Sequence, residues 1–411
     1  MPALDGLRIL DLTQYEAGTS CTQALAWLGA DVVKVERPET GDPGRGLFGR
    51  ANQDSEYFIN WNSNKRSIAI NLGTTQGRGL LLRLLPGFDI LIENFGPGVV
   101  EKLRLDYDAI REVHPEVIYG RIKGFGNSGP YSDFKCFDPV AQAAGGAMSI
   151  TGETDGPPLR PGTTIGDCGT GLLMALSLSA AYAHKLRTGK GQLVEISMQE
   201  GVTWFMRTAI AMGGDFGRQA APRSGTGRGA LMNLYPCKPF GPNDYVYMLV
   251  VTNRMWESLC EVLGRTDLGD DPRFTTPRLR NENGDELVEI VAEWTARHTK
   301  HEAMSILGEA GVPASAVLDT LDLFSDPHLL ARGFVHTLDH ESRGAVKVLG
   351  SPMNLSGSDV EIKAAPLLGR HTDSVLAEEL NLTQTDIDRL RAEGVLGAEP
   401  APTTDGQETT T

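Results

Sequence analysis

The first part of the chain alternates short runs of aliphatic and β-branched residues with longer segments that have a helical apolar period. The runs LRILDLT at 7–13 and DVVKVE at 31–36 are typical of strands, and SCTQALAWLGA at 20–30 between them is typical of a helix. The alternation continues with a helix at 75–85, a strand at 88–94, a helix near 99–112 and a strand at 116–123. This pattern predicts the α/β class, with a mostly parallel sheet covered by helices on both faces.

The second half of the chain has a different pattern. A stretch rich in glycine and arginine at 213–229 predicts a linker. A strand at 244–251 and helices at 253–263, 285–297 and 301–310 then predict a small α+β domain, and a strand-like piece at 344–350 and a helix near 384–393 follow. The polar, proline-containing tail at 398–411 is expected to be disordered.

Composition and charge exclude several classes of function. With 411 residues the chain is expected to form two domains, and its formal net charge of −15 disfavours binding to nucleic acid or to an anionic membrane. The five cysteines are odd in number and have no CxxC spacing, which indicates reduced thiols and a cytoplasmic location. The longest apolar run, at 171–183, is too short to span a bilayer.

The stretch RPGTTIGDCGTG at 160–171 places one carboxylate, Asp167, among glycines just before an apolar helical run. Aspartate is one of the best helix N-cap residues, so capping is one interpretation. Capping does not require Gly166, Gly169 and Gly171, and glycines let a ligand or another backbone approach closely. Backbone N–H groups at a helix start can also hold an oxyanion. These residues alone leave a capping role and a chemical role open.

Other patterns add little chemistry. Arg37 directly follows a strand, where a parallel sheet presents ligand contacts, and the chain has no Walker A or GxGxxG motif. Two histidine pairs, His298 with His301 and His336 with His340, have helix-face spacing but no third ligand nearby. We therefore expect solvent-exposed histidines and no metal site.

Several segments together resemble the class III CoA-transferases, of the formyl-CoA transferase and carnitine CoA-transferase type. They run in order from about residue 4 to residue 395 and include ALDGLRILDLTQYEAG, LGADVVKVERPETGDPGR, NKRSIAINL, ENFGPG, PGTTIGDCGTG, TGKGQLVEISMQE and APLLGRHTDSVL. The resemblance implies a Rossmann-like large domain, a small α+β domain joined by two linkers, and a homodimer of interlocked chains. On this basis the expected organisation is a large domain at 1–212, a linker at 213–229, a small domain at 230–312, a second linker at 313–335 and a return to the large domain at 336–397.

The resemblance also implies a reaction and a set of site residues. Asp167 matches the family's nucleophile, which forms an aspartyl-acyl anhydride and then an aspartyl-CoA thioester. Acyl-CoA and a free carboxylic acid are the implied substrates, and no tightly bound cofactor is expected. The implied CoA contacts are Glu16, Ala17, Arg37, Ile70, Asn71, Leu72, Gly73, Asn94, Phe95, Gly96, Lys102, Lys135 and Met198.

The chain departs from formyl-CoA transferase at two places. Glu16 stands where that enzyme has glutamine, and an extra carboxylate is expected to disfavour oxalate as acceptor. The lid region lacks a run of four glycines but contains Arg223 and Arg228, which could hold a second carboxylate. A four- or five-carbon dicarboxylic or hydroxy acid is therefore the hypothesis for the acceptor, with solvated arginines on a mobile loop as the alternative.

Two other functions stay open. The racemases of the same family have GHD where this chain has Cys136, Phe137 and Asp138, and phenylalanine cannot carry a proton. Transferase is therefore favoured over racemase. The other alternative is a CoA-binding subunit of a hetero-oligomeric transferase.

Overall fold

The computed structural model describes residues 1–49 and 53–398, which divide into two compact units. The first unit contains Met1–Ala147, Arg160–Ala211 and the part that starts at Ala331, and the second contains Met148–Leu159 and Met212–Leu330. The predicted tail lies, apart from residue 398, outside the described residues. The linkers expected at 213–229 and 313–335 remain predictions.

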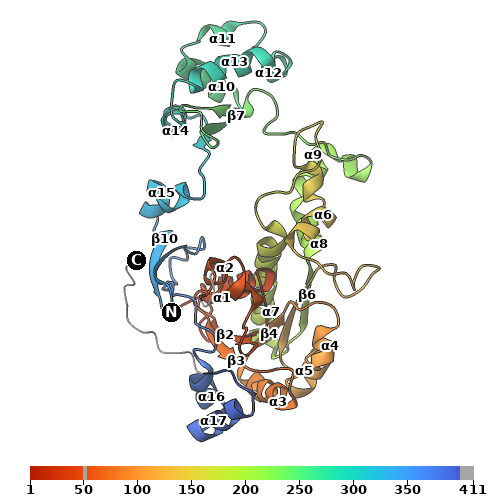
Figure 1. Cartoon of the computed structure of the whole chain (residues 1–411). Helices are drawn as coiled ribbons and strands as arrows, with labels where there is room; N and C mark the ends of the chain where they lie inside the picture. The colour runs from red at the N-terminus through yellow and green to blue at the C-terminus, as the bar shows by residue number, and fades with distance from the viewer. Residues whose placement is uncertain (50–52, 399–411) are drawn as a thin grey trace. The chain divides into compact units, whose positions relative to one another are not determined.

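The first unit is built on a six-stranded parallel sheet with the order β3-β2-β1-β4-β5-β6 (Figure 1). Its strands are β1 (Arg8–Asp11), β2 (Asp31–Glu36), β3 (Arg66–Ala69), β4 (Ile90–Glu93), β5 (Ile118–Lys123) and β6 (Leu193–Ser197). This is the Rossmann order. Strands β2 and β3 are added on one side of β1, and β4, β5 and β6 are added on the other side, so the order of the strands reverses between β1 and β4. Ligands of such sheets bind beyond the carboxyl ends of the strands at that reversal. The predicted α/β class with a parallel sheet is confirmed.

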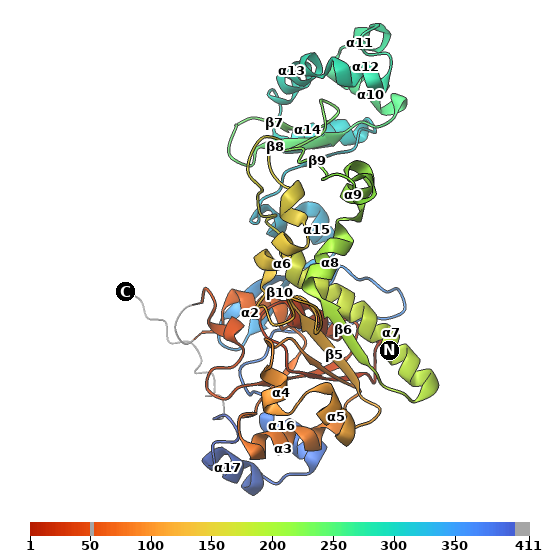
Figure 2. The same cartoon turned by 90° about the vertical axis from the view of Figure 1, so that its right-hand side faces the viewer.

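Helices cover both faces of this sheet, with α7 on one face and α3, α5 and α16 on the other (Figure 2). Helix α1 packs against α7. The helices of the first unit are α1 (Ala17–Ala26), α2 (Glu56–Trp61), α3 (Thr75–Leu84), α4 (Val99–Leu103), α5 (Tyr107–Val113), α6 (Asp138–Ala144), α7 (Thr170–Thr188), α8 (Met198–Phe205), α16 (Thr372–Leu380) and α17 (Gln384–Ala392). Helices α9 (Arg207–Gly213) and α15 (Pro327–Ala331) lie where the chain passes between the units. An antiparallel pair, β10 (Val335–His340) and β11 (Gly344–Leu349), also belongs to the first unit.

The prediction of a single helix near 99–112 is wrong, because the structure has two helices there, α4 and α5. Arg104 ends α4 in the left-handed region, with φ of 52°. Asp106 then starts α5, since its side chain accepts a hydrogen bond from the backbone N–H of Ala109 at 3.2 Å. A helical period alone could not show this interruption.

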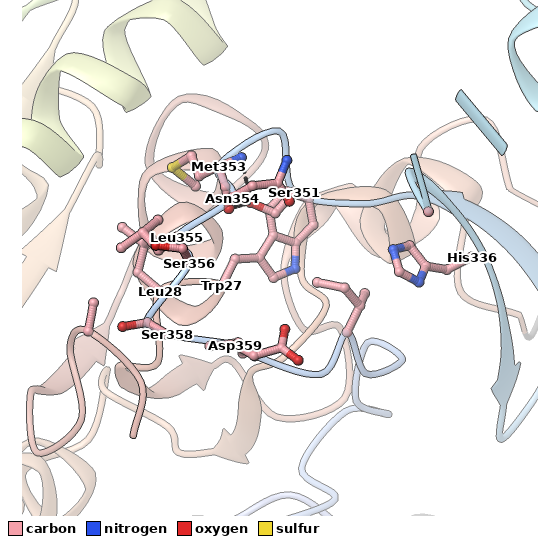
Figure 3. Close-up of a pocket in the computed structure, with 14 residues that line it drawn as sticks. Trp27, Leu28, His336, Ser351, Met353, Asn354, Leu355, Ser356, Ser358 and Asp359 are labelled. Carbon is pink, nitrogen blue, oxygen red and sulfur yellow. Dashed lines mark hydrogen bonds between the residues drawn. The ribbon is translucent and has the colours of Figure 1, made fainter. Parts of the chain in front are cut away.

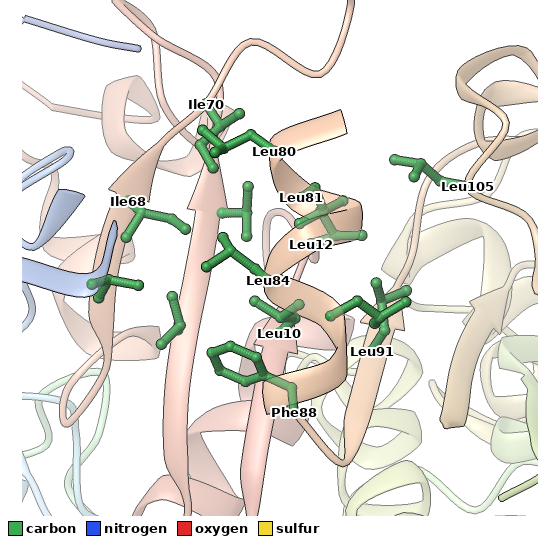
Figure 4. Packing of buried hydrophobic residues seen from close by; sticks show 14 of the residues in the cluster. Leu10, Leu12, Ile68, Ile70, Leu80, Leu81, Leu84, Phe88, Leu91 and Leu105 are labelled. Carbon is green, nitrogen blue, oxygen red and sulfur yellow. The ribbon is translucent and has the colours of Figure 1, made fainter. Parts of the chain in front are cut away.

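One face of the sheet buries an aliphatic core against α3 (Figure 4). Leu80, Leu81 and Leu84 on α3 face Leu10 and Ile68 on the strands, and all five are at most 4% exposed. Because strand side chains alternate between faces, the neighbours of Leu10 in β1 point to the opposite face, toward α1 and α7. The carboxyl ends of the strands are therefore held rigidly by packing on both sides.

The second unit has its own small sheet and core. Strands β7 (Met232–Pro236), β8 (Tyr245–Leu249) and β9 (Ala314–Ala316) form an antiparallel sheet. Its helices are α10 (Asn253–Leu263), α11 (Asp267–Asp270), α12 (Pro277–Glu282), α13 (Gly284–Thr295) and α14 (Lys300–Glu309). The core holds Trp256, Phe274 and Trp294. Across the described residues of both units, we find no helix with the length and hydropathy needed to cross a membrane.

Candidate active site

A cavity of about 490 Å³ lies at the point where the sheet reverses, and we call it the Asp167 cavity. The loops after β1, β4 and β5 and the segment before α7 form its walls. It is lined by Gln14, Tyr15, Ala17, Asn94, Phe95, Gly96, Pro97, Val99, Ile122, Lys123, Gly124, Ser132, Phe134, Lys135, Cys136, Phe137, Asp167 and Met198. Seven residues expected from the sequence therefore meet here: Ala17, Asn94, Phe95, Gly96, Lys135, Asp167 and Met198.

Side chains from other elements hold the loop after β1 in place. Tyr15 adopts φ of 59°, and its backbone N–H donates to Asp42 Oδ1 at 3.0 Å. Asn94 Oδ1 accepts from the Gln14 N–H, and Asn94 Nδ2 donates to the Gln14 carbonyl, both at 2.8 Å. The Asn94 amide, expected to contact CoA, is thus engaged at both ends in positioning this loop. A non-glycine residue with positive φ persists only when its surroundings fix it in this way.

Buried ion pairs lie under the same loop. The side chains of Lys34 and Asp42 are at most 1% exposed, and their charged atoms are 2.8 Å apart. Lys34 Nζ also donates to the Thr13 carbonyl at 2.6 Å. Lys65 Nζ pairs with Asp11 at 3.2 Å, and neither side chain is exposed. These buried ion pairs therefore stabilise the wall of the cavity.

Asp167 lies in a single π-helical turn, Ile165–Gly169, that leads into α7. The N-cap of α7 is Gly169 and receives no side-chain capping bond, so the capping interpretation of Asp167 is wrong. The π turn is wider than an α turn, and it moves Asp167 away from the capping position.

The glycines around Asp167 serve packing between helices. A Cβ atom on Gly171 would lie 2.1 Å from Ser20 Oγ and 2.5 Å from the Ala17 carbonyl oxygen, both on α1. One on Gly169 would lie 2.8 Å from the Phe205 ring on α8. Close approach of other protein groups, which the sequence left as one option, therefore explains these glycines.

The backbone N–H groups of this turn are already engaged. The N–H of Gly166 donates to Asp138 Oδ1 at 2.9 Å, and those of Asp167 and Cys168 donate to the Thr164 carbonyl at 3.1 and 2.8 Å. The expectation that N–H groups at this helix start hold an oxyanion therefore does not apply to these three. The Asp138 carboxylate thus holds the turn in place, and Gln142 Nε2 donates to Asp138 Oδ2 at 2.7 Å.

The Asp167 carboxylate is partly buried, and among the described residues we find no side-chain hydrogen bond or ion pair to it. Burial, followed by the nearby charges of Glu16 and Asp138, raises its pKa to about 8. Burial also raises the pKa of Glu16 to about 7. A carboxylate perturbed in this way and facing a cavity is a candidate reactive group.

A second cavity of about 590 Å³ holds two more of the expected residues, Arg37 and Asn71, and we call it the Arg37 cavity. Pro38, Glu39 and residues between Arg391 and Ala398 complete its lining. Five expected contacts line neither cavity. Ile70 is fully buried in the sheet core, and Leu72 packs against that core. Gly73 and Lys102 are exposed, and Glu16 is buried.

A third cavity, of about 360 Å³, is separate from these residues (Figure 3). Trp27, His336 and Asp359 are among its lining residues, and none of the expected CoA contacts lines it. His340, expected to be exposed, is only 1% exposed, because β10 packs it inside the unit. Across residues 1–49 and 53–398 no group of three or more potential metal ligands occurs.

Sequence reasoning missed the residues that hold the site together. Asp42, Asp138 and Thr164 position the loop or the turn without reaching the cavity themselves. The available signals were weak: Thr164 belongs to the recognised PGTTIGD segment, and Asp138 precedes a proline at a helix start. Nothing in the sequence shows that Asp138 accepts a bond from a turn 28 positions later.

Comparison with known proteins identifies the family of this chain. A family model described as CoA-transferase family III matches residues 4–372. Formyl-CoA:oxalate CoA-transferases from Streptomyces avermitilis and Streptomyces coelicolor are 42% and 40% identical to this chain, each over 96% of this chain and 99% of the relative. A solved structure of a CAIB/BAIF family protein from Brucella suis superimposes with a TM-score of 0.81 at 31% identity, covering 92% of this chain and 99% of that one.

Proposed function

This chain belongs to CoA-transferase family III, and on that premise we propose that it moves CoA from an acyl-CoA to a free carboxylic acid through covalent intermediates on Asp167. The observation that carries this proposal is the Asp167 carboxylate, which faces a cavity at the reversal of the sheet without a cationic partner among the described residues. In its ionised form, a carboxylate that no cation or N–H neutralises keeps its electron pairs available for attack.

The proposed reaction passes through two covalent intermediates on Asp167. An Asp167 oxygen attacks the thioester carbonyl, the C–S bond breaks, and an aspartyl-acyl anhydride and a CoA thiolate form. The thiolate attacks the Asp167 carbonyl of the anhydride, which releases the donor acid as its carboxylate and leaves an aspartyl-CoA thioester. The acceptor carboxylate then runs the same steps in reverse. No proton is gained or lost overall.

Two assays separate this proposal from its alternatives. Purified alone, the chain is expected to exchange an isotope-labelled free acid into acyl-CoA, read by mass spectrometry; a subunit that needs a catalytic partner would show no exchange. In deuterated water without an acceptor acid, a transferase leaves the α-carbon of the acyl group unlabelled. Phe137 lines the Asp167 cavity with a side chain that has no titratable atom, so we expect no α-deuterium.

Replacement of Arg37 by alanine should weaken CoA binding. Arg37 is exposed in its cavity at the carboxyl end of β2, where a guanidinium can pair with a phosphate. We expect the KM for the acyl-CoA to rise about tenfold, with kcat changed less. Steady-state kinetics test this, with Arg111→Ala on the exposed surface of α5 as the matched control. Equal KM values for wild type and Arg37→Ala would contradict the assignment.

We propose a dicarboxylic acid as acceptor, with oxalate included. The support is that relatives at 40–42% identity bear the name formyl-CoA:oxalate CoA-transferase. The argument against oxalate from the charge of Glu16 weakens, because burial raises the pKa of that carboxyl to about 7. The argument for a longer chain also weakens, because the Arg223 guanidinium donates to the carbonyls of Ser149, Glu153 and Gly156.

A competition assay tests the acceptor. One acyl-CoA donor is offered equal concentrations of oxalate, succinate, formate and butyrate, and the CoA esters formed are separated by mass spectrometry. A dicarboxylic acid should show the largest kcat/KM. Preference for either monocarboxylate would remove the acceptor proposal while leaving CoA transfer itself intact.

A further inference from the structure

Buried acids of the first unit fall into two kinds. Asp11, Glu36, Asp42 and Glu93 are at most 3% exposed, and each forms an ion pair with a lysine or arginine. Glu16 is equally buried, at 3% exposure, but no ion pair to it occurs among the described residues. A buried carboxylate is costly to keep ionised unless a cation or several hydrogen bonds compensate its charge.

Among residues 1–49 and 53–398, the hydrogen-bond partners of the Glu16 side chain are hydroxyl groups alone. Thr164 Oγ1 donates to Glu16 Oε1, and the Tyr57 hydroxyl lies 3.4 Å from Oε2. Asp138 is also buried without a cation among the described residues, but it accepts from the Gly166 N–H and from the Gln142 amide. Glu16 is therefore the buried acid of this unit with the least compensation for a negative charge.

Glu16 accepts a hydrogen bond from Thr164, the N-cap residue of the π turn that carries Asp167. Thr164, which donates to Glu16, also accepts the backbone N–H groups of Asp167 and Cys168. The titratable groups around Glu16 are Tyr57 on α2, Asp138 on α6, and Asp167 and Cys168 on the π turn. None of these groups can carry a positive charge, so no cation among them offsets an ionised Glu16 beside an ionised Asp167.

Resting on the function proposed above, we propose that Glu16 and Asp167 share one proton near neutral pH and that CoA transfer proceeds while Glu16 carries it. Glu16 is then a positioning residue: because it is protonated, Glu16 and Asp167 together carry one negative charge. The proton stays on Glu16 through both attacks, so the reaction needs no further donor or acceptor. When Glu16 ionises, its charge opposes the thiolate and the anionic tetrahedral adducts that form at Asp167.

The pH profile of Glu16→Gln tests this directly. Folding raises the pKa values of Glu16 and Asp167 to about 7 and about 8, so the pair loses its last proton above that range. Wild-type kcat/KM should therefore fall by about tenfold per pH unit on the alkaline side. Glutamine carries no titrating proton, so the kcat/KM of Glu16→Gln should stay constant up to pH 9. The fall of kcat/KM on the acid side should also move to lower pH in this variant. Glu101→Gln, exposed on α4, should keep the wild-type profile.

A spectroscopic measurement separates this proposal from the function itself. Difference infrared spectra between neutral and alkaline pH should show a protonated-carboxyl band in wild type that is lost in Glu16→Gln. The proposal is overturned if Glu16→Gln keeps the wild-type alkaline limb, or if no protonated-carboxyl band depends on Glu16. If instead Asp167 proves not to be the nucleophile, the band assigned to Glu16 would still be present, so the two failures are distinguishable.

Discussion

Replacement of Asp167 by asparagine is expected to lower CoA transfer by at least about 10³-fold. The amide cannot attack a thioester or form an anhydride, so neither of the two proposed covalent intermediates can form. Binding should survive, because the expected CoA contacts that line the two cavities are unchanged. The measurement is exchange of labelled acid into acyl-CoA at saturating substrate, together with the Kd for the acyl-CoA.

The same variant separates chemistry from structure. The pKa of Asp167 is raised in the folded state, so its carboxylate destabilises the fold increasingly as pH rises from about 4 to about 8. The Asp167→Asn substitution removes that charge, and the Tm of the variant at pH 8 should be equal to or above the wild-type value. Asp133→Asn, a change at an exposed position, should retain full transfer. Substantial transfer by purified Asp167→Asn would exclude Asp167 as the nucleophile.

Replacement of Lys34 by methionine is expected to lower the free energy of unfolding by about 3–5 kcal/mol. Methionine fills similar space but leaves Asp42 buried beside the loop after β1 without its cation. The loss includes the hydrogen bond from Lys34 Nζ to the Thr13 carbonyl, so the loop that lines the cavity is loosened as well. Denaturant unfolding followed by circular dichroism measures the effect.

An exposed ion pair supplies the matched control. Arg297 and Glu293 pair at 3.3 Å with side chains 58% and 79% exposed, so Arg297→Met should change the stability by about 0–1 kcal/mol. A similar small change for Lys34→Met would show that the buried pair does not stabilise the unit. The double variant Lys34→Met with Asp42→Asn should recover part of the loss, since it leaves no unpaired charge.

The sheet was readable from the sequence because strands buried on both faces are nearly continuous aliphatic runs. DVVKVE predicted 31–36, and β2 spans Asp31–Glu36. Strand β3 was not assigned, because RSIA is only four residues long and two of them are polar or charged. The same limit applies to Lys34. A lysine inside a strand predicts a side chain that faces solvent, and no nearby sequence pattern shows that Lys34 pairs with Asp42.

The candidate site was readable only in part, and for a related reason. Asp167 stood out through its glycine-rich context, but the sequence could not distinguish a cap from a π turn, because that difference depends on how the turn packs on α1 and α8. Nor could it show that the Asn94 amide is engaged by the Gln14 backbone 80 positions earlier. Long-range hydrogen bonds of this kind have no local pattern.

Trapping of the covalent intermediate tests Asp167 as the nucleophile most directly. Enzyme and acyl-CoA are mixed without an acceptor acid, hydroxylamine is added to displace CoA from the aspartyl thioester, and the digested protein is mapped by mass spectrometry. The predicted result is a hydroxamate on Asp167 that requires acyl-CoA and is absent in Asp167→Asn. A hydroxamate on Glu16 or Asp138, or no modification while exchange of labelled acid continues, would contradict it.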